Sequence, residues 1–280
     1  MAIESSHCTT WEQSKTAVRR GHYVTEMPRA RRLYRGHGDS RWRLVPPVHR
    51  VSNPAADLPE YRFNPQWEHY LETFKQSLVG MPNVNADALR NPRQLWVLGR
   101  HFGLATPLLD WTTSPYIAAF FAFWCALQRA FPGIQEGLWW GADLASLKGS
   151  RIPLDEASVT IWSLLRPVNE YGNALEHIPG AQGLVFIDER KDAFHRQKAQ
   201  QAVFTRLTGP DIDLEVYLES QGKASFLTRY DLPARCFVEA LAELQMMNIN
   251  LANLFPDVSG AALQANVDEL IHSLLSRGAA

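Results

Sequence analysis

Residues 114–127 read SPYIAAFFAFWCAL, and this stretch decides the fold. Ser114-Pro115 is a typical helix start, because serine caps helices and proline is favoured at the first helical position. The run from Tyr116 to Leu127 is apolar on every side, which predicts a helix at the centre of the protein. It is shorter than the ~18–20 residues needed to cross a bilayer, so it predicts a core helix and no membrane partner.

Further helices and short strands are predicted on both sides of this central helix. Apolar residues recur at helical spacing from Trp67 to Leu78, and Asn91-Pro92 is a second helix start. The chain turns helical again after Pro233. Together these elements predict one α+β domain with a mostly antiparallel sheet flanked by several helices. Short strands are expected at residues 33–35, 137–144, 183–188, 202–207 and 214–218.

Composition bounds the class of protein. The 280 residues are 46% hydrophobic and 20% charged, which is typical of a globular chain, and no linker divides them, so residues 1–280 are expected to form one domain. The net charge of −1 argues against nucleic acid or an anionic membrane as a partner. Cys8, Cys125 and Cys236 are too few and too far apart for a disulfide framework. The first thirty residues have no apolar signal segment, so a cytoplasmic location is expected.

Tyr34-Arg35-Gly36 is the first candidate for ligand binding. The triplet ends a short strand and enters a glycine-rich turn, so Arg35 is expected to point into a cleft. The planar guanidinium suits bidentate binding of a phosphate or carboxylate, and Gly36 would let a ligand approach the backbone. The alternative is that Arg35 only braces the turn, for example through Asp39.

The polar turn at residues 110–114, DWTTS, is the second candidate. Ser114 is the natural helix cap, which leaves Thr112 and Thr113 free to face a ligand. The helix N-terminus attracts anions, so a diphosphate is expected between it and Arg35. The structural alternative is a polar capping cluster and nothing more.

Asp110 has several possible roles in this turn. It could orient His101, receive Arg35, or tie down the turn by accepting hydrogen bonds from backbone N–H groups. The spacing of the residues leaves these alternatives open.

Other kinds of chemistry have no motif in the chain. The nine histidines show no HxxxH or HxH spacing, so no metal site is expected. The sequence has no GxSxG nucleophile elbow, no Walker loop and no GxGxxG motif.

Taken in order, the motifs resemble the FRG domain family, which is named for an aromatic-Arg-Gly triplet. The resemblance covers about residues 10–265 and implies a single FRG-like domain. The sequence departs from the family pattern at Ala105, Pro107 and Ala202. The segments that carry the resemblance are Tyr34-Arg35-Gly36, then Trp42, Leu44, Pro46 and Arg50, then His101-Phe102-Gly103-Leu104, and finally residues 108–115, 200–205 and 254–260.

A more distant resemblance is to R-S-E type ADP-ribosyltransferases. It implies an NAD-binding enzyme, a transferase or an NAD glycohydrolase, acting as a toxin, effector or phage-defence factor on a target such as a protein. It further implies catalytic positions for Arg35, Thr112 and Gln200. The cofactor contacts that it implies are Tyr34, Gly36, His101, Asp110, Thr113 and Ser114.

Gln200 falls near the place of the transferase glutamate. That glutamate hydrogen-bonds the ribose 2′-hydroxyl and stabilises an oxocarbenium-like transition state with its charge. Glutamine keeps the hydrogen bond and loses the charge, a deficit of ~3–4 kcal/mol. Either another carboxylate serves, or the chain is a non-catalytic nucleotide-binding or protein-interaction module. The candidate carboxylates are Glu170, Glu176, Asp188 and Glu189.

Overall fold

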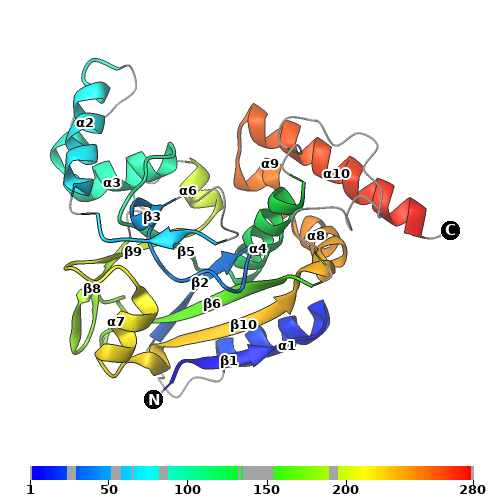
Figure 1. The fold of residues 1–280 in the computed structure, drawn as a ribbon, viewed down its shortest axis with the longest axis horizontal. Coiled ribbons are helices and arrows are strands. Elements are labelled where there is room, and N and C mark those ends of the chain that lie inside the picture. Colours follow the sequence, from blue (N-terminus) through cyan, green and yellow to red (C-terminus); the bar gives the residue numbers. More distant parts are fainter. Residues whose placement is uncertain are drawn as a thin grey trace.

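The computed structural model describes residues 2–23, 30–51, 58–64, 66–81, 88–131, 134, 154, 156–188 and 195–278. The strand expected at residues 137–144 and the candidate carboxylate Glu189 lie outside this part of the chain. Figure 1 shows a central sheet with helices packed around it. The predicted α+β class is therefore confirmed.

In the described part of the chain, the main sheet has eight strands in the order β1-β10-β6-β2-β5-β9-β8-β7. Neighbouring strands are antiparallel except for β1 and β10. The predicted strands at residues 33–35, 183–188 and 202–207 lie in this sheet. The strands are β1 (Glu4–His7), β2 (Ala30–His37), β5 (Leu109–Thr112), β6 (Ser158–Pro167), β7 (His177–Ile178), β8 (Ala181–Ile187), β9 (Ala202–Leu207) and β10 (Leu227–Pro233), and β3 (Arg50–Val51) pairs with β4 (Glu60–Tyr61) in a small second sheet.

The helices predicted from apolar spacing are present. Asn91 caps one of them through hydrogen bonds from the backbone N–H groups of Arg93 and Gln94. In the part of the chain that the structure describes, no helix is long and apolar enough to span a membrane. The α-helices are α1 (Trp11–Tyr23), α2 (Trp67–Leu78), α3 (Pro92–His101), α4 (Pro115–Ala130), α6 (His195–Ala199), α7 (Leu214–Ser220), α8 (Phe237–Met246), α9 (Leu251–Leu254) and α10 (Val258–Gly278).

The strand expected at residues 214–218 is wrong, because this segment begins helix α7. The carboxylate of Asp213 accepts hydrogen bonds from the backbone N–H groups of Glu215 and Val216, which is the usual N-cap arrangement. Tyr217 is buried in the same cluster as the first residue of the helix, and a spacing of three residues places both on one helix face. Five residues that include four apolar ones are too few to distinguish a strand from a helix, and the capping aspartate favours the helix.

Helix α4 lies against the sheet at very short range because both surfaces are made of small residues. A Cβ atom on Gly36 would lie 2.0 Å from the carbonyl oxygen of Ala118 and 2.6 Å from the backbone nitrogen of Ala122. A Cβ atom on Gly38, the residue that follows β2, would meet Cys125 and Ala126 in the same way. Gly36 therefore leaves room for the backbone of helix α4.

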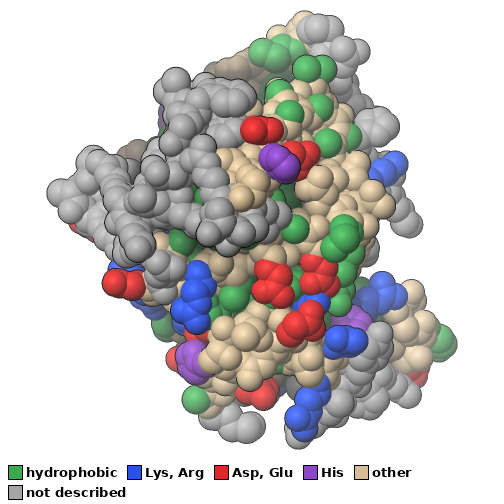
Figure 2. Space-filling view, turned by 90° about the vertical axis from the view of Figure 1, so that its right-hand side faces the viewer, with side chains coloured by type: hydrophobic (Ala, Val, Ile, Leu, Met, Phe, Trp, Pro, Cys, Tyr) green, Lys and Arg blue, Asp and Glu red, His purple; other side chains and the backbone are tan. Residues whose placement is uncertain are grey.

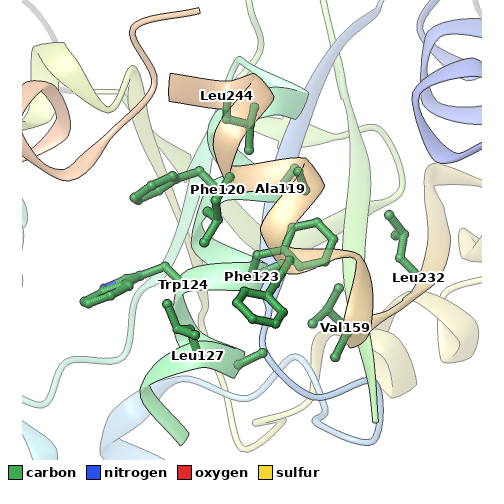
Figure 3. Packing of buried hydrophobic residues seen from close by; sticks show 14 of the residues in the cluster. Ala119, Phe120, Phe123, Trp124, Leu127, Val159, Leu232 and Leu244 are labelled. Carbon is green, nitrogen blue, oxygen red and sulfur yellow. The ribbon is translucent and has the colours of Figure 1, made fainter. Parts of the chain in front are cut away.

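The rest of helix α4 fills the main hydrophobic core. Its side chains pack in one cluster with residues of β6, β10 and α8, as Figure 3 shows. This cluster confirms the predicted central helix and fixes α4 on one face of the sheet. The labelled residues of the cluster are Ala119, Phe120, Phe123, Trp124, Leu127, Val159, Leu232 and Leu244.

The sheet divides between β2 and β5. Strand β2 pairs with β6 from Ala30 to His37, but its register with β5 is a single pair, Tyr34 with Thr112. Strand β5 instead follows β9 along its whole length. The backbone beyond Tyr34 therefore separates from the neighbouring strand on one side, which opens space in the middle of the sheet.

We expect Gly36→Ala to lower the free energy of unfolding by about 3 kcal/mol, because the clashing atoms belong to backbone and cannot rotate away. Gly172→Ala is the control: no atom lies within 4 Å of its added Cβ, and its φ of 78° costs about 1 kcal/mol. Urea denaturation measures both changes. Equal losses in the two variants would contradict the close packing of α4 on β2.

Candidate functional site

A cavity of about 830 Å³ lies where β2 and β5 separate. Its walls come from these two strands, from β9, and from helices α3, α4, α6 and α9. This volume is in the range of small-molecule sites. The charged side chains that line it, among the described residues, are Arg35, Arg50, Arg100, Arg196 and Asp110.

The charge in this cavity is unbalanced. Four arginines and one aspartate give a formal excess of three positive charges, although the whole chain has a net charge of −1. On the face of the molecule shown in Figure 2, by contrast, acidic and basic side chains are interspersed. The concentration of positive charge in a concave site indicates an anionic ligand.

Asp110 is shared by two arginines. Arg35 Nη1 donates to the Asp110 carbonyl oxygen at 2.7 Å and to its Oδ2 at 3.3 Å. Arg100 donates from Nε to both carboxylate oxygens, at 2.9 and 3.0 Å, and from Nη2 to Oδ2 at 2.6 Å. Arg35 therefore joins β2 to β5 across the opening of the sheet.

Burial disfavours ionisation of Asp110, but the charges and hydrogen bonds of Arg100 and Arg35 outweigh it and hold the pKa of the carboxyl below its ordinary value. The same carboxylate raises the pKa of Arg100. At neutral pH Asp110, Arg35 and Arg100 are all charged. The two guanidinium groups therefore leave an excess of positive charge over the one carboxylate.

His37 fixes the orientation of Arg35 from the other side. Arg35 Nε donates to His37 Nε2 at 3.0 Å, so that nitrogen carries no proton. The proton is on Nδ1, which lies 3.3 Å from the carbonyl oxygen of Trp42. Burial, together with the charges of Arg35 and Arg50, keeps the pKa of His37 well below its usual value. A neutral histidine thus acts as a fixed acceptor for Arg35.

Arg50 and Arg196 have N–H donors that make no hydrogen bond with any described residue. Arg50 Nε donates to the carbonyl oxygen of Val45 at 2.8 Å, and its guanidinium makes no other hydrogen bond with a described residue. Burial and the charges of Arg35 and Arg100 lower the pKa of Arg50 to about 10. Arg196 lies over the ring of Phe255 at 4.0 Å from its centroid and forms no ion pair with a described residue.

Most residues predicted for the site do line this cavity. Tyr34 is fully buried, with its hydroxyl 2.8 Å from His22 Nδ1. The Thr112 hydroxyl accepts a hydrogen bond from the backbone N–H of Ser114 at 3.2 Å, so it is engaged within the turn. The predicted residues that line the cavity are Tyr34, Arg35, Gly36, His101, Asp110, Thr112 and Gln200.

Thr113 and Ser114 are placed elsewhere. The Thr113 hydroxyl donates to Gln201 Oε1 at 2.6 Å, and the Ser114 hydroxyl caps α4 by accepting from the backbone N–H of Ile117. The first helical residues, Pro115 and Tyr116, line a smaller cavity of about 230 Å³. The expected diphosphate position between Arg35 and the start of α4 is therefore not supplied by this geometry, and arginines replace the helix N-terminus as the source of positive charge.

Arg35 does not brace the turn through Asp39, which is the structural alternative raised above. The Asp39 carboxylate is instead ion-paired with Arg41 and Arg129. Asp110 takes one of the roles considered for it, since it receives Arg35.

Gln200 lines the cavity but partly serves the fold. Its Nε2 donates to the carbonyl oxygen of Leu254 at 3.1 Å, which ties the end of α6 to α9. The candidate carboxylates that the structure describes lie outside the cavity: Glu176 pairs with Arg93, Asp188 pairs with Arg166, and Glu170 is exposed. Among the described lining residues, Asp110 supplies the only carboxylate.

Aromatic rings and amides complete the walls. Phe121 packs edge to face with Phe255, and Phe102 is exposed beside His101. Within the described ranges, no group of three or more His, Cys, Asp or Glu residues is placed to hold a metal ion. The cavity thus offers cationic donors together with flat apolar surfaces. Trp42, Trp124, Gln128 and Gln197 are further lining residues.

Residues 30–130 match the family model of the FRG domain. The chain carries an FRG domain. No match was found among curated proteins or among solved structures.

The matched FRG domain segment supplies one side of the cavity. It contains Arg35, Arg50, Arg100 and Asp110, whereas Arg196 and the α9 residues come from the later part of the chain. The match is shorter than residues 10–265, over which the sequence resembles the family. The cavity of this FRG domain protein is therefore completed by residues beyond the matched segment.

Asp110→Asn should destabilise the FRG domain protein, because it leaves Arg35 and Arg100 facing each other without a counter-charge. We expect a loss of about 2 kcal/mol at neutral pH, below the value for fully buried pairs because about a third of the Asp110 side chain is open to solvent. Urea denaturation between pH 3 and pH 7 measures the loss.

The pH dependence has a defined sign. Since the pKa of Asp110 is lowered in the folded protein, its contribution is present above the ordinary value of 3.8 and is lost as the pH falls further. The difference between wild type and Asp110→Asn should therefore shrink in acid. A difference that grows in acid would contradict the pairing.

Proposed function

We propose that this protein binds NAD in the arginine-lined cavity and is ADP-ribosyltransferase-like. The observation that carries the proposal is the excess of three positive charges in a cavity of about 830 Å³. A diphosphate is the part of NAD that such a surplus would recognise, since guanidinium groups bind phosphate oxygens through two parallel hydrogen bonds. Arg50 has both Nη groups free of described partners for this purpose.

The order of the strands supports the transferase resemblance. Strands β2, β5 and β9 are neighbours, and Tyr34, Thr112 and Ala202 are aligned across them. Arg35 and Gln200 lie next to this row in sequence, and both line the cavity. The arginine, hydroxyl and late-strand positions of that family thus have counterparts around one cavity.

The fixed groups suit binding without rearrangement. Arg35 is only 11% exposed and is held by Asp110 and His37, so its position is set before a ligand arrives. Preorganised donors lose little conformational entropy on binding. The aromatic walls, including Trp42 and Phe255, would accept the planar rings of the dinucleotide.

Cleavage of NAD needs more than binding. The bond between nicotinamide and ribose breaks through a transition state with positive charge on the sugar, which a carboxylate stabilises. Asp110 is engaged by two arginines, and Gln200 has no charge to offer. These facts favour the second candidate, a nucleotide-binding module without turnover. If the first candidate holds and the protein cleaves NAD, we expect it to act as a toxin, effector or phage-defence factor.

A melting experiment tests NAD binding directly. At a concentration of about 100 times Kd, NAD should stabilise the protein by about 2.7 kcal/mol and raise Tm by roughly 5 °C. Arg50→Gln should weaken NAD binding about tenfold or more, because it removes charged hydrogen bonds to phosphate. Arg31→Gln is the matched control, since Arg31 also donates to one backbone carbonyl but does not line the cavity.

No shift with NAD in the wild type would refute the proposal, as would equal binding by Arg50→Gln and wild type. Nicotinamide release, measured by chromatography, distinguishes the NAD-cleaving enzyme from the binding module. Release by the wild type supports the enzyme. Release only by Gln200→Glu supports the binding module, and places Gln200 at the position of the transferase glutamate.

A further inference from the structure

The surplus of positive charge in the cavity exceeds what NAD can neutralise. NAD has two negative charges on its diphosphate and one positive charge on its pyridinium ring, so its net charge is −1. Among the described lining residues, four arginines are accompanied by one carboxylate, that of Asp110, so the formal surplus of the lining is three. Burying unpaired charges is costly, so a ligand with more phosphate would fit this cavity better.

The two arginines with donors free of described partners belong to different elements. Arg50 follows the 3-10 turn Pro47–His49, and Arg196 is on helix α6. Burial lowers the pKa of both guanidinium groups, although the carboxylates of Asp257 and Asp110 act in the opposite direction on Arg196. Arg50 and Arg196 therefore reach the cavity from different segments of the chain, and each guanidinium can bind an anion there.

Arg196 is held in place as a binding group. Its guanidinium stacks on Phe255 at 4.0 Å, and helix α6 is tied to α9 by the hydrogen bond from Gln200 to Leu254. A guanidinium stacked on an aromatic ring keeps its edge free for hydrogen bonds to a planar or tetrahedral anion. The Asp257 carboxylate is near enough to raise the pKa of Arg196, but no carboxylate among the described residues forms an ion pair with this guanidinium.

We infer that the cavity takes a dinucleotide that carries a third phosphate in addition to its diphosphate, and that Arg196 binds this phosphate. The inference rests on the proposed function and narrows it to a substrate class. The diphosphate would be bound by Arg50 with Arg35, and the third phosphate by Arg196. Bound in this way, the ligand would leave no guanidinium in the cavity without an anionic partner.

Titration calorimetry with NAD and with NADP tests the inference. The wild type should bind NADP about tenfold or more tightly than NAD, because one added charged contact is worth that much. The preference should diminish as salt is raised. Arg196→Gln should lower the NADP affinity about tenfold more than the NAD affinity. Arg206→Gln is the matched control, since Arg206 stacks on Trp67 at 4.5 Å outside the cavity, and it should keep the preference.

The outcomes separate this inference from the function on which it rests. Equal affinity for NAD and NADP in the wild type would overturn the third-phosphate site and leave NAD binding intact. A preference for NADP that survives in Arg196→Gln would overturn the assignment to Arg196. Binding of neither dinucleotide would overturn the proposed function and the inference with it. A cooperative urea transition of Arg196→Gln, compared with that of Arg206→Gln, shows whether the variant is folded.

Discussion

The Asp110 carboxylate, bound by Arg35 and Arg100, is the interaction on which the rest of the site depends. Strands β2 and β5 share one register pair and then separate, so a group must join them across the opening. Arg35 does this through both the carbonyl and the carboxylate of Asp110. One negative charge cannot neutralise two buried guanidinium groups, and Arg50 and Arg196 add two more. The interaction of Arg35 with Asp110 joins β2 to β5, but a single carboxylate leaves the cavity with a net positive charge.

The second constraint is the contact between helix α4 and strand β2. Ala118 and Ala122 of the helix lie against Gly36, which leaves no room for a side chain at that position. This contact fixes the strand that carries Arg35 relative to the helix that supplies Phe121 and Cys125 to the cavity wall. The same small residues, Gly36, Ala118 and Ala122, thus determine both the packing of the helix on the strand and the position of the cavity-lining side chains. The glycine after Arg35 is needed for the fold whether or not a ligand approaches it.

Local sequence signals were enough to predict part of this arrangement. The helix starts at Asn91-Pro92 and Ser114-Pro115 are predicted correctly, because helix capping depends on adjacent residues. Strand β10 was not predicted, since it contains the buried Asp231, whose partners include Thr160, which is distant in sequence, as well as the nearby Arg229. Arg50 and Arg196 were also not predicted as site residues. These two arginines come to one cavity only through the tertiary structure, so the spacing of residues along the chain does not predict it.

The central claim is that the cationic cavity exists to bind the phosphates of a dinucleotide. A crystal structure of the protein grown with NADP tests it most directly. The account predicts diphosphate oxygens within hydrogen-bonding distance, about 2.7–3.2 Å, of the Arg50 Nη atoms, with the remaining phosphate on Arg196. A dinucleotide bound outside the cavity, or bound inside it with its phosphates turned away from both arginines, would contradict the account.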